Sequence, residues 1–300
     1  MKALVLGGGS LKGAWQVGVV QAILENGFEP DMIYGISVGS LNSSFLVQEA
    51  GKQYIENGKI DWPSVSKKLI EFWITHITQP ESIALVRSRF TLGFDTIMSR
   101  FDGLLDSTPL QTLIKTQFDP FVLRNSPIKT KAGAVDILSG EMIYASPQDP
   151  NYLDYIIASS SLPTLMPAIR IGGDHRRAFL DGGLREVAPL RQALEDGATE
   201  IVCVACHTER MHDEPFNYRN VLKLIERMKD INVNQIVNTD ILSAERYIEN
   251  ENFRGKNLKM KLIRPQKPLR LDMLKFNSDD IAALIVQGFK EGFEWVEQQK

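Results

Sequence analysis

Met32-Ile33-Tyr34-Gly35-Ile36-Ser37-Val38-Gly39 is the most informative stretch of the chain, because a serine between two glycines joins two segments of different pattern. The apolar run before the serine predicts a buried strand, and the apolar and small residues of 38–47 predict a helix. Gly35 and Gly39 permit a sharp strand-to-helix turn, which lifts the Ser37 hydroxyl out of the backbone. The first N–H groups of the helix then point toward whatever binds the serine.

A second strand–turn–helix unit precedes this one. Residues 2–6 predict a buried strand, residues 7–10 (Gly-Gly-Gly-Ser) a turn, and residues 12–26 a helix whose apolar side chains recur every three to four positions. Two such units in succession indicate a parallel sheet with right-handed crossovers. Because parallel strands end at the same edge of a sheet, the two glycine-containing turns should lie side by side.

The rest of the chain continues the alternation of strands and helices. Strands are expected at 131–136, 142–145, 200–206 and 258–263, and helices at 152–160, 189–195, 221–249 and 279–298. Residues 52–127 are less regular, with apolar segments at 69–77, 90–101 and 109–118, and favour an inserted helical cap region over the site. Without internal repeats or a linker, we expect one α/β domain over residues 1–300: three α/β/α layers around a mainly parallel central sheet.

Composition excludes several classes of protein. Hydrophobic residues make up 43% of the 300 and charged residues 24%, as in ordinary globular proteins, and a net charge of −3 argues against nucleic acid as a partner. No run of 18 apolar residues predicts a transmembrane helix, and the four-residue apolar stretch at the N-terminus is too short for a signal peptide. We therefore expect a cytoplasmic protein, with peripheral contact to a membrane surface still open.

The two cysteines favour a reducing compartment. Cys203 and Cys206 lie inside an apolar strand-like run and are expected to be buried thiols. His207 and His212 are close in sequence, but their spacing from the cysteines matches no common zinc pattern, so no metal site is expected.

Acyl transfer needs a nucleophile, a base and donors for an oxyanion, and the two glycine turns supply candidates for two of these. Ser37 is the candidate nucleophile, and Gly7, Gly8 and Gly9 are candidate donors. Two nucleotide-binding interpretations of this loop fail. A dinucleotide fingerprint needs glycine where Lys12 stands, and a Walker loop needs lysine where Ala14 stands.

The candidate base is an aspartate. None of the four histidines lies in an obvious catalytic loop; His175, for example, falls in a polar, hairpin-like stretch at 173–177. Asp181 follows the apolar pair Phe179-Leu180 and precedes Gly182 and Gly183, so its carboxylate can project from a strand end into a tight space. The plain alternative is a turn, because Asp-Gly is a common turn dipeptide.

Taken together, four blocks resemble the patatin-like phospholipase family of serine acyl hydrolases. Gly7 to Gly13 resembles the glycine-rich oxyanion loop of the family, with Lys12 as its basic residue and Gly13 as its closing glycine. Gly35 to Gly39 resembles the nucleophile turn, Ala158 to Pro163 the Ala-Ser-x-x-x-Pro segment, and Asp181-Gly182-Gly183 the Asp-Gly-Gly/Ala motif. The resemblance spans residues 2–206, and it is weakest over residues 52–127.

The resemblance implies a patatin-like fold and a catalytic dyad of Ser37 and Asp181 without histidine, metal or cofactor. Asp181 would accept the Ser37 proton, and N–H groups of the Gly7–Gly9 loop and of Val38 would hold the oxyanion. A carboxylate at its usual pKa near 4 is a weak base for a serine. We therefore predict that a dry site raises the Asp181 pKa.

Several points stay open at this level. The substrate could be a phospholipid, lysophospholipid, triacylglycerol or simple ester; a non-lipid esterase or thioesterase and a catalytically idle lipid-binding relative are alternatives. Lys12 could support the oxyanion, pair with an acidic group or simply face solvent. Apolar side chains between 69 and 101 could line an acyl pocket, touch a membrane or pack in the core: Phe72, Trp73, Ile74, Leu85, Phe90 and Phe94. The oligomeric state is not predicted.

Overall fold

A central sheet organises the molecule. The computed structural model describes residues 1–88, 103–173, 176–212 and 219–300. The sheet has the order β6-β5-β2-β1-β8-β9, and β7 pairs with β5 beside this path. The parallel strands are β1 (Lys2–Leu6), β2 (Met32–Ile36), β5 (Lys129–Asp136), β8 (Glu200–Val204) and β9 (Lys259–Ile263). Two antiparallel strands, β6 (Met142–Ala145) and β7 (Phe179–Asp181), flank β5, so the sheet is mainly parallel, as predicted.

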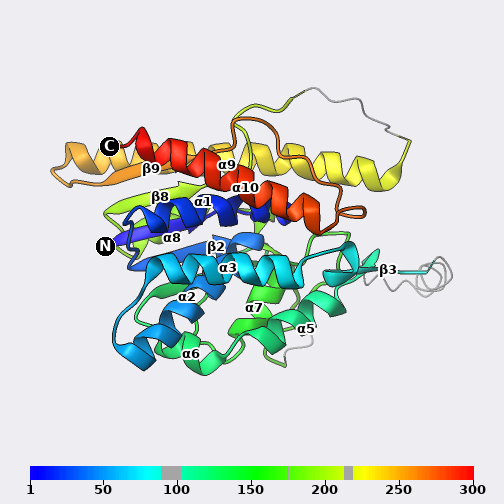
Figure 1. Ribbon diagram of the computed structural model, residues 1–300. Helices are drawn as coiled ribbons and strands as arrows, with labels where there is room; N and C mark the ends of the chain where they lie inside the picture. The colour runs from blue at the N-terminus through cyan, green and yellow to red at the C-terminus, as the bar shows by residue number, and fades with distance from the viewer. Residues whose placement is uncertain (89–102, 174–175, 213–218) are drawn as a thin grey trace.

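Helices cover both faces of the sheet and complete three α/β/α layers, which confirms the predicted fold class. One face packs against α1 (Gly13–Glu25), α2 (Val38–Asn57), α3 (Trp62–His76), α5 (Thr108–Gln117), α6 (Pro120–Asn125), α7 (Tyr152–Ser159) and α10 (Ser278–Glu297). Helices α1, α3 and α10 of this layer cross in front of the sheet in Figure 1. The other face packs against α8 (Leu190–Glu195) and α9 (Val221–Phe253). Because both faces are covered, the central strands are buried from Ala3 to Leu6 and from Met32 to Ile36.

Strand register brings the sequence motifs together at one edge. Leu6 of β1 is the partner of Gly35 of β2, so the Gly7–Gly9 loop and the serine turn leave neighbouring strands at the same level, as expected. On the other side of β2, Ile36 is the partner of Gly133 of β5, and the next residue of β5 pairs with Asp181 of β7. Three segments far apart in sequence therefore converge on the carboxyl end of β2.

The predicted elements differ from the observed ones mainly in length. Helix α2 runs ten residues beyond the predicted Val47, because the glycine at position 51 lets it pack closely on α6: a Cβ there would lie 3.1 Å from the Val122 carbonyl oxygen. The segment 52–127 holds α3, α5 and α6, together with the short pair β3 (Leu85–Val86) and β4 (Leu105–Asp106), which no period-2 pattern announces. The expected apolar helix at 90–101 lies outside the described residues, and the division into one domain with an insertion stays a prediction.

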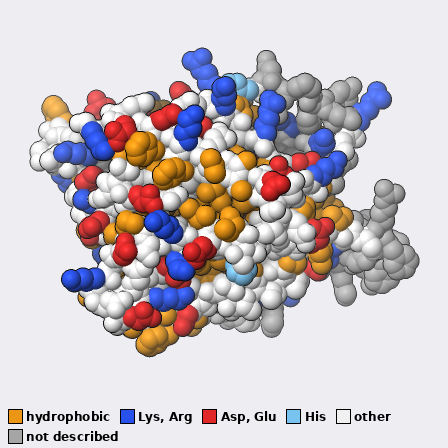
Figure 2. All heavy atoms as spheres, in the orientation of Figure 1, with side chains coloured by type: hydrophobic (Ala, Val, Ile, Leu, Met, Phe, Trp, Pro, Cys, Tyr) orange, Lys and Arg blue, Asp and Glu red, His pale blue; other side chains and the backbone are white. Residues whose placement is uncertain are grey.

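Hydrophobic side chains also gather on the outer face of one helix layer (Figure 2). The exposed large hydrophobic residues of α3 and α10 include Ile74, Val286 and Phe293. Over the ranges given above, no helix is long and apolar enough to cross a membrane.

Candidate active site

The serine turn is built by close packing. Ser37 has φ 57° and ψ −129°, a conformation that side-chain-bearing residues rarely adopt and that is typical of strained functional turns. The flanking glycines supply room. A Cβ at Gly35 would lie 2.0 Å from the Gly39 carbonyl oxygen, and a Cβ at Gly39 would lie 2.0 Å from the Leu6 carbonyl oxygen. The serine itself therefore carries the positive φ, and the glycines let β1, β2 and α2 approach one another.

Ser37 is hydrogen-bonded to Asp181. The serine hydroxyl donates to Oδ2 of the carboxylate at 2.7 Å, and the Gly183 N–H donates to Oδ1 at 2.7 Å. Asp181 is only 4% exposed, and burial raises its pKa from 3.8 to about 6, although the hydrogen bonds from Gly183 and Ser37 and the charge of Lys229 oppose this shift. The predicted upward shift is confirmed, and the carboxylate is a stronger base than a solvated aspartate.

The Ala158–Pro163 segment holds both residues of this pair. The Ser37 N–H donates to Oγ of Ser159 at 2.8 Å, and the Asp181 N–H donates to the Ser161 carbonyl at 3.0 Å. Sequence reasoning matched this segment to a family pattern but gave it no task. The structure shows one: it fixes the backbone of the serine turn and of the aspartate relative to each other.

The glycine-rich loop differs from the expectation in its donors. The Gly7 N–H donates to the Val204 carbonyl at 3.0 Å and the Gly8 N–H to the Val187 carbonyl at 2.9 Å, so neither is available for an oxyanion. Gly7 continues the parallel pairing of β1 with β8 past Leu6, and Gly8 bonds to the segment that precedes α8; sequence pattern alone reveals neither contact. Among described residues, the N–H groups of Gly9 and of Val38, at the start of α2, have no hydrogen-bond partner.

Close contacts leave no room for a side chain at three further motif glycines. A Cβ at Gly9 would lie 2.4 Å from Cβ of Cys206, one at Gly13 2.3 Å from Cγ2 of Val38, and one at Gly182 2.6 Å from the Gly133 carbonyl oxygen. At Gly8 a Cβ would come within 3.2 Å of the Ser37 Cβ. Side chains at these positions would push the loop, the serine turn and the aspartate apart.

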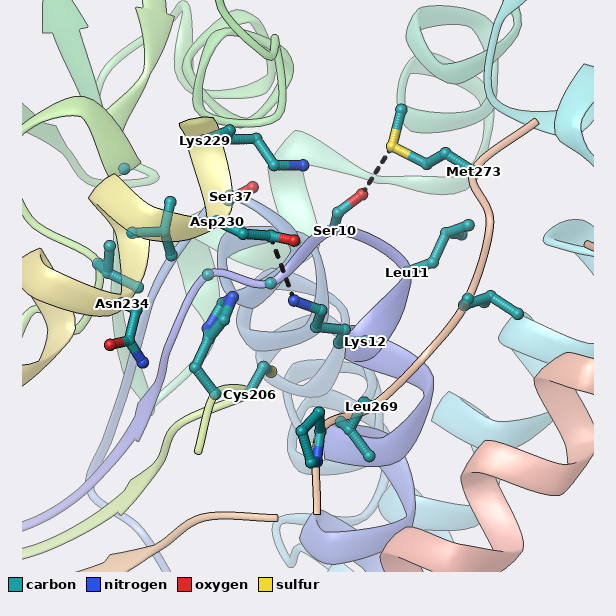
Figure 3. A pocket seen from close by; sticks show the side chains of 18 of the residues that line it. Ser10, Leu11, Lys12, Ser37, Cys206, Lys229, Asp230, Asn234, Leu269 and Met273 are labelled. Atoms are coloured by element: carbon teal, nitrogen blue, oxygen red, sulfur yellow. Dashed lines mark hydrogen bonds and ion pairs between the residues drawn. The ribbon is translucent and has the colours of Figure 1, made fainter. Parts of the chain in front are cut away.

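Lys12 pairs with an acidic group, which was one of the three possibilities left open. Its Nζ lies 3.4 Å from Oδ1 of Asp230 on α9, and both side chains are partly exposed. In the same loop, the Ser10 hydroxyl donates to the sulfur of Met273 at 3.1 Å (Figure 3). The loop that carries Gly9 is thus held from two sides by C-terminal elements.

Two cavities of different character meet at Ser37. A cavity of about 340 Å³, called here the polar cavity because charged side chains line part of it, is shared by the serine, Asp181, the glycine-rich loop and α9. Lys229 and Asp230 of α9 lie across it from the loop (Figure 3). An apolar cavity of about 70 Å³ lies on the other side; its lining includes Leu11, Val38, Leu41, Trp73, Leu105, Leu110, Leu162, Met166 and Met273. The site can therefore accept a molecule with one polar and one apolar part.

The histidines take no part in the serine–aspartate pair. His207 and His212 line the polar cavity, and burial together with the charges of Lys12, Lys229 and Arg264 holds the His207 pKa well below 6.5. Among described residues, the only hydrogen-bond partner of the Ser37 hydroxyl is Asp181. The hairpin expected around His175 lies partly outside those residues, and in the part of the chain that is described no cluster of three or more His, Cys, Asp or Glu side chains could hold a metal.

The aromatic residues singled out at 72–73 belong to the core. Phe72 is 4% and Trp73 1% exposed, and the Trp73 indole donates to the buried Asn42 at 2.8 Å. Because Trp73 is buried, the interpretation that its side chain touches a membrane is wrong. It does line the apolar cavity, in agreement with the interpretation that it belongs to a pocket. Ile74 and Leu85 are exposed, and Phe90 and Phe94 lie outside the described residues.

Fold and site together define a three-layer α/β protein with a serine–aspartate pair at the carboxyl edge of a mainly parallel sheet. The chain belongs to the patatin-like phospholipase family, whose model matches residues 4–194 and so includes both members of the pair. This membership supports a lipid acyl hydrolase in general terms.

Individual relatives are distant. The uncharacterized protein YjjU of Escherichia coli K12 is 25% identical over 274 residues, 89% of this chain and 69% of YjjU. Patatin-like phospholipase domain-containing protein 7 of Rattus norvegicus and lysophospholipase NTE1 of Meyerozyma guilliermondii are each 26% identical over 67% of this chain, which spans 13% and 12% of their lengths. Among solved structures, VipD from Legionella pneumophila aligns with a TM-score of 0.41 and 12% identity, over 99% of this chain and 67% of VipD.

Proposed function

We propose that this protein hydrolyses carboxylic esters of lipids, as a phospholipase A or lysophospholipase type of enzyme, through a Ser37–Asp181 dyad and an acyl-enzyme. The observation that carries the proposal is the 2.7 Å hydrogen bond between the Ser37 hydroxyl and a buried carboxylate, at the point where a polar and an apolar cavity meet. Family membership and the 26% identity to a protein named lysophospholipase support the same substrate class.

The reaction follows from the positions of these groups. Asp181 takes the Ser37 proton as Oγ attacks the ester carbonyl, and the negative charge on the carbonyl oxygen is held by the N–H groups of Gly9 and Val38. The tetrahedral intermediate collapses with cleavage of the C–O bond, and the protonated aspartate gives its proton to the leaving alcohol. Asp181 then removes a proton from water, which attacks the acyl-enzyme. The C–O bond to Ser37 breaks as Asp181 returns this proton to Oγ, and the fatty acid is released.

The two cavities support a binding mode in which the two halves of the substrate lie apart. The acyl chain enters the apolar cavity beside Leu41 and Leu110, and the alcohol part occupies the polar cavity beside α9. Burial of methylene groups contributes about 0.8 kcal/mol each, so the apolar cavity favours an acyl chain over a short polar acid. An amphiphilic ester satisfies both cavities, whereas a triacylglycerol leaves the polar one without a partner.

The experiment that tests the proposal is a hydrolysis panel with matched acyl chains. Purified protein is given a lysophospholipid, a diacyl phospholipid, a triacylglycerol, an acyl-coenzyme A thioester and a water-soluble acetate ester, and released acid is measured. We expect the highest kcat/KM for the lysophospholipid or phospholipid. Preference for the thioester or for the acetate ester would favour the thioesterase or simple esterase alternative, and binding without turnover would favour the idle relative.

The pH dependence of the reaction should report the Asp181 pKa. Because the free carboxylate is the base and its pKa is about 6, kcat/KM should fall by about tenfold per pH unit below that value and level off above it. Initial rates between pH 4 and 9, with folding verified by circular dichroism at each pH, measure this. A profile that stays flat down to pH 5 would contradict the raised pKa.

Filling the apolar cavity should change chain-length preference. Leu110 lines that cavity and is 6% exposed, so Leu110→Phe should lower kcat/KM for long-chain esters by about tenfold while sparing acetate and butyrate esters. Leu123→Phe is the matched control, since Leu123 is 2% exposed on α6 and lines neither cavity. An equal loss for all chain lengths would show that this cavity does not take the acyl chain.

A further inference from the structure

Asp240 of α9 lies behind the glycine-rich loop, outside the residues matched by the family model. One of its carboxylate oxygens, Oδ2, accepts two successive backbone N–H groups, from Val187 at 2.7 Å and from Ala188 at 3.0 Å. Val187 and Ala188 are 1% and 0% exposed, so in the absence of Asp240 these two donors would be buried without an acceptor.

The segment held by Asp240 continues into the loop that carries the oxyanion donor. The Val187 carbonyl accepts the Gly8 N–H at 2.9 Å, and Gly8 packs against the side chain of Ser37. This hydrogen bond fixes the Gly7–Gly8 peptide, which directly precedes the peptide that carries the Gly9 N–H, and that N–H has no hydrogen-bond partner among described residues. Asp240, Val187 and Gly8 form a continuous series of contacts from α9 to the serine.

The segment held by Asp240 also follows the proposed base, Asp181, directly in sequence. Residues 182–188 follow Asp181 directly, with the Arg185 and Glu186 N–H groups donating to the Gly182 carbonyl, and they end where α8 begins. The two hydrogen bonds from Val187 and Ala188 to Asp240 therefore fix the far end of the segment that follows Asp181. Through Gly8 they also fix the glycine-rich loop. Asp240 contacts neither Ser37 nor the cavity that contains it.

We propose that Asp240 is a positioning residue of the reaction: its Oδ2 clamps Val187 and Ala188 so that the Val187 carbonyl holds Gly8 and aims the Gly9 N–H at the oxyanion. The inference rests on the proposed function for its catalytic consequence, whereas the clamp itself is a structural claim. What the clamp requires is an acceptor oxygen at one place, and negative charge is secondary. An amide of the same length can supply that oxygen, and a methyl group cannot.

Three variants test the clamp. Asp240→Asn should label with a fluorophosphonate at a rate within about threefold of wild type, whereas Asp240→Ala should label about tenfold to a hundredfold more slowly, because small displacements of catalytic groups cost rates of this size. In ester hydrolysis the loss should fall on kcat, with KM nearly unchanged. Should Asp240→Ala not fold, Asp240→Gln replaces it, since its amide is one methylene too long to meet both N–H groups, and the same loss is expected.

A matched control separates positioning from stability. Gln48 on α2 is 1% exposed and also makes two hydrogen bonds to backbone, accepting the Asp119 N–H and donating to the Gln117 carbonyl, away from both cavities. Gln48→Ala should lower the melting temperature and leave the labelling rate of folded protein unchanged. Asp240→Ala labelling at the wild-type rate with only a lower melting temperature, or Asp240→Asn labelling as slowly as Asp240→Ala, would overturn the inference.

Amide hydrogen exchange tests the clamp without any activity. In Asp240→Ala, peptides covering residues 4–11 and 184–190 should exchange faster than in wild type, whereas they should be unchanged in Gln48→Ala and in Asp240→Asn. Unchanged exchange in Asp240→Ala would overturn the clamp. Failure of the wild type to label or to hydrolyse esters would instead refute the proposed function, and the exchange result would stand on its own.

Discussion

Replacing Ser37 by alanine should lower kcat for ester hydrolysis by about 10⁴- to 10⁶-fold, since removal of a serine nucleophile has effects of this size in other hydrolases. No other described side chain donates to Asp181 from a position where the two cavities meet. The rate of fatty acid release under saturating substrate measures the effect. Loss of the hydroxyl should leave the fold intact.

Ser43→Ala is the matched control for this variant. Ser43 lies on α2, the helix that starts directly after Ser37; it is fully buried, donates to the Ser40 carbonyl at 3.1 Å and lines neither cavity. We expect its activity to remain within about threefold of wild type, because a helix-internal serine of this kind contributes to packing alone. More than one percent of wild-type activity in purified Ser37→Ala would place the nucleophile elsewhere.

Asp181→Asn should lower kcat by about 10³- to 10⁴-fold, the range observed when a general base is neutralised. The amide oxygen can still accept the Gly183 N–H, and the amide nitrogen can donate to the Ser37 oxygen, so the geometry should persist while the ability to take a proton is lost. Activity assays between pH 6 and 9 test this. A variant that regains wild-type rates at high pH would show that hydroxide can replace the carboxylate and that the aspartate is not the base.

The same variant should be more stable than the wild type at neutral pH. Because burial raises the Asp181 pKa from 3.8 to about 6 in the folded protein, the neutral form is favoured by folding, and its contribution to stability is lost as pH rises through that range. The ionised carboxylate then opposes folding by up to about 3 kcal/mol. Urea unfolding should show Asp181→Asn gaining stability at pH 8 and losing that gain below about pH 4; a variant less stable at pH 8 would contradict this.

Much of the architecture could be predicted because the central strands are short apolar runs ended by glycine turns. Residues 3–6 and 32–36 are buried on both faces, and such strands stand out against the helix between them. The lengths of the helices were harder to predict from sequence. Helix α2 continues over a polar sequence because Gly51 packs on α6, which is a contact between distant segments. The two-residue strands at 85–86 and 105–106 are too short for any periodicity.

In the candidate site, too, some features could be predicted from sequence and others could not. The pairing of Ser37 with Asp181 could be expected because their glycine-flanked motifs resemble those of a known family, and the raised pKa of the aspartate because a carboxylate that serves a serine needs a dry site. The donors could not be assigned, since the fate of the Gly7 and Gly8 N–H groups depends on carbonyls of Val204 and Val187 far along the chain. The tasks of Ser159 and Asp240 also depend on contacts that span more than 50 residues.

The most direct test is to react the folded protein with a fluorescent fluorophosphonate and to locate the adduct by peptide mass spectrometry. We expect one adduct, on Ser37, whose rate of formation falls as pH drops through the Asp181 pKa of about 6 and drops sharply in Asp181→Asn. Folded wild-type protein that stays unlabelled in the presence of lysophospholipid micelles, or that labels at another serine, would contradict a nucleophile at Ser37 activated by Asp181.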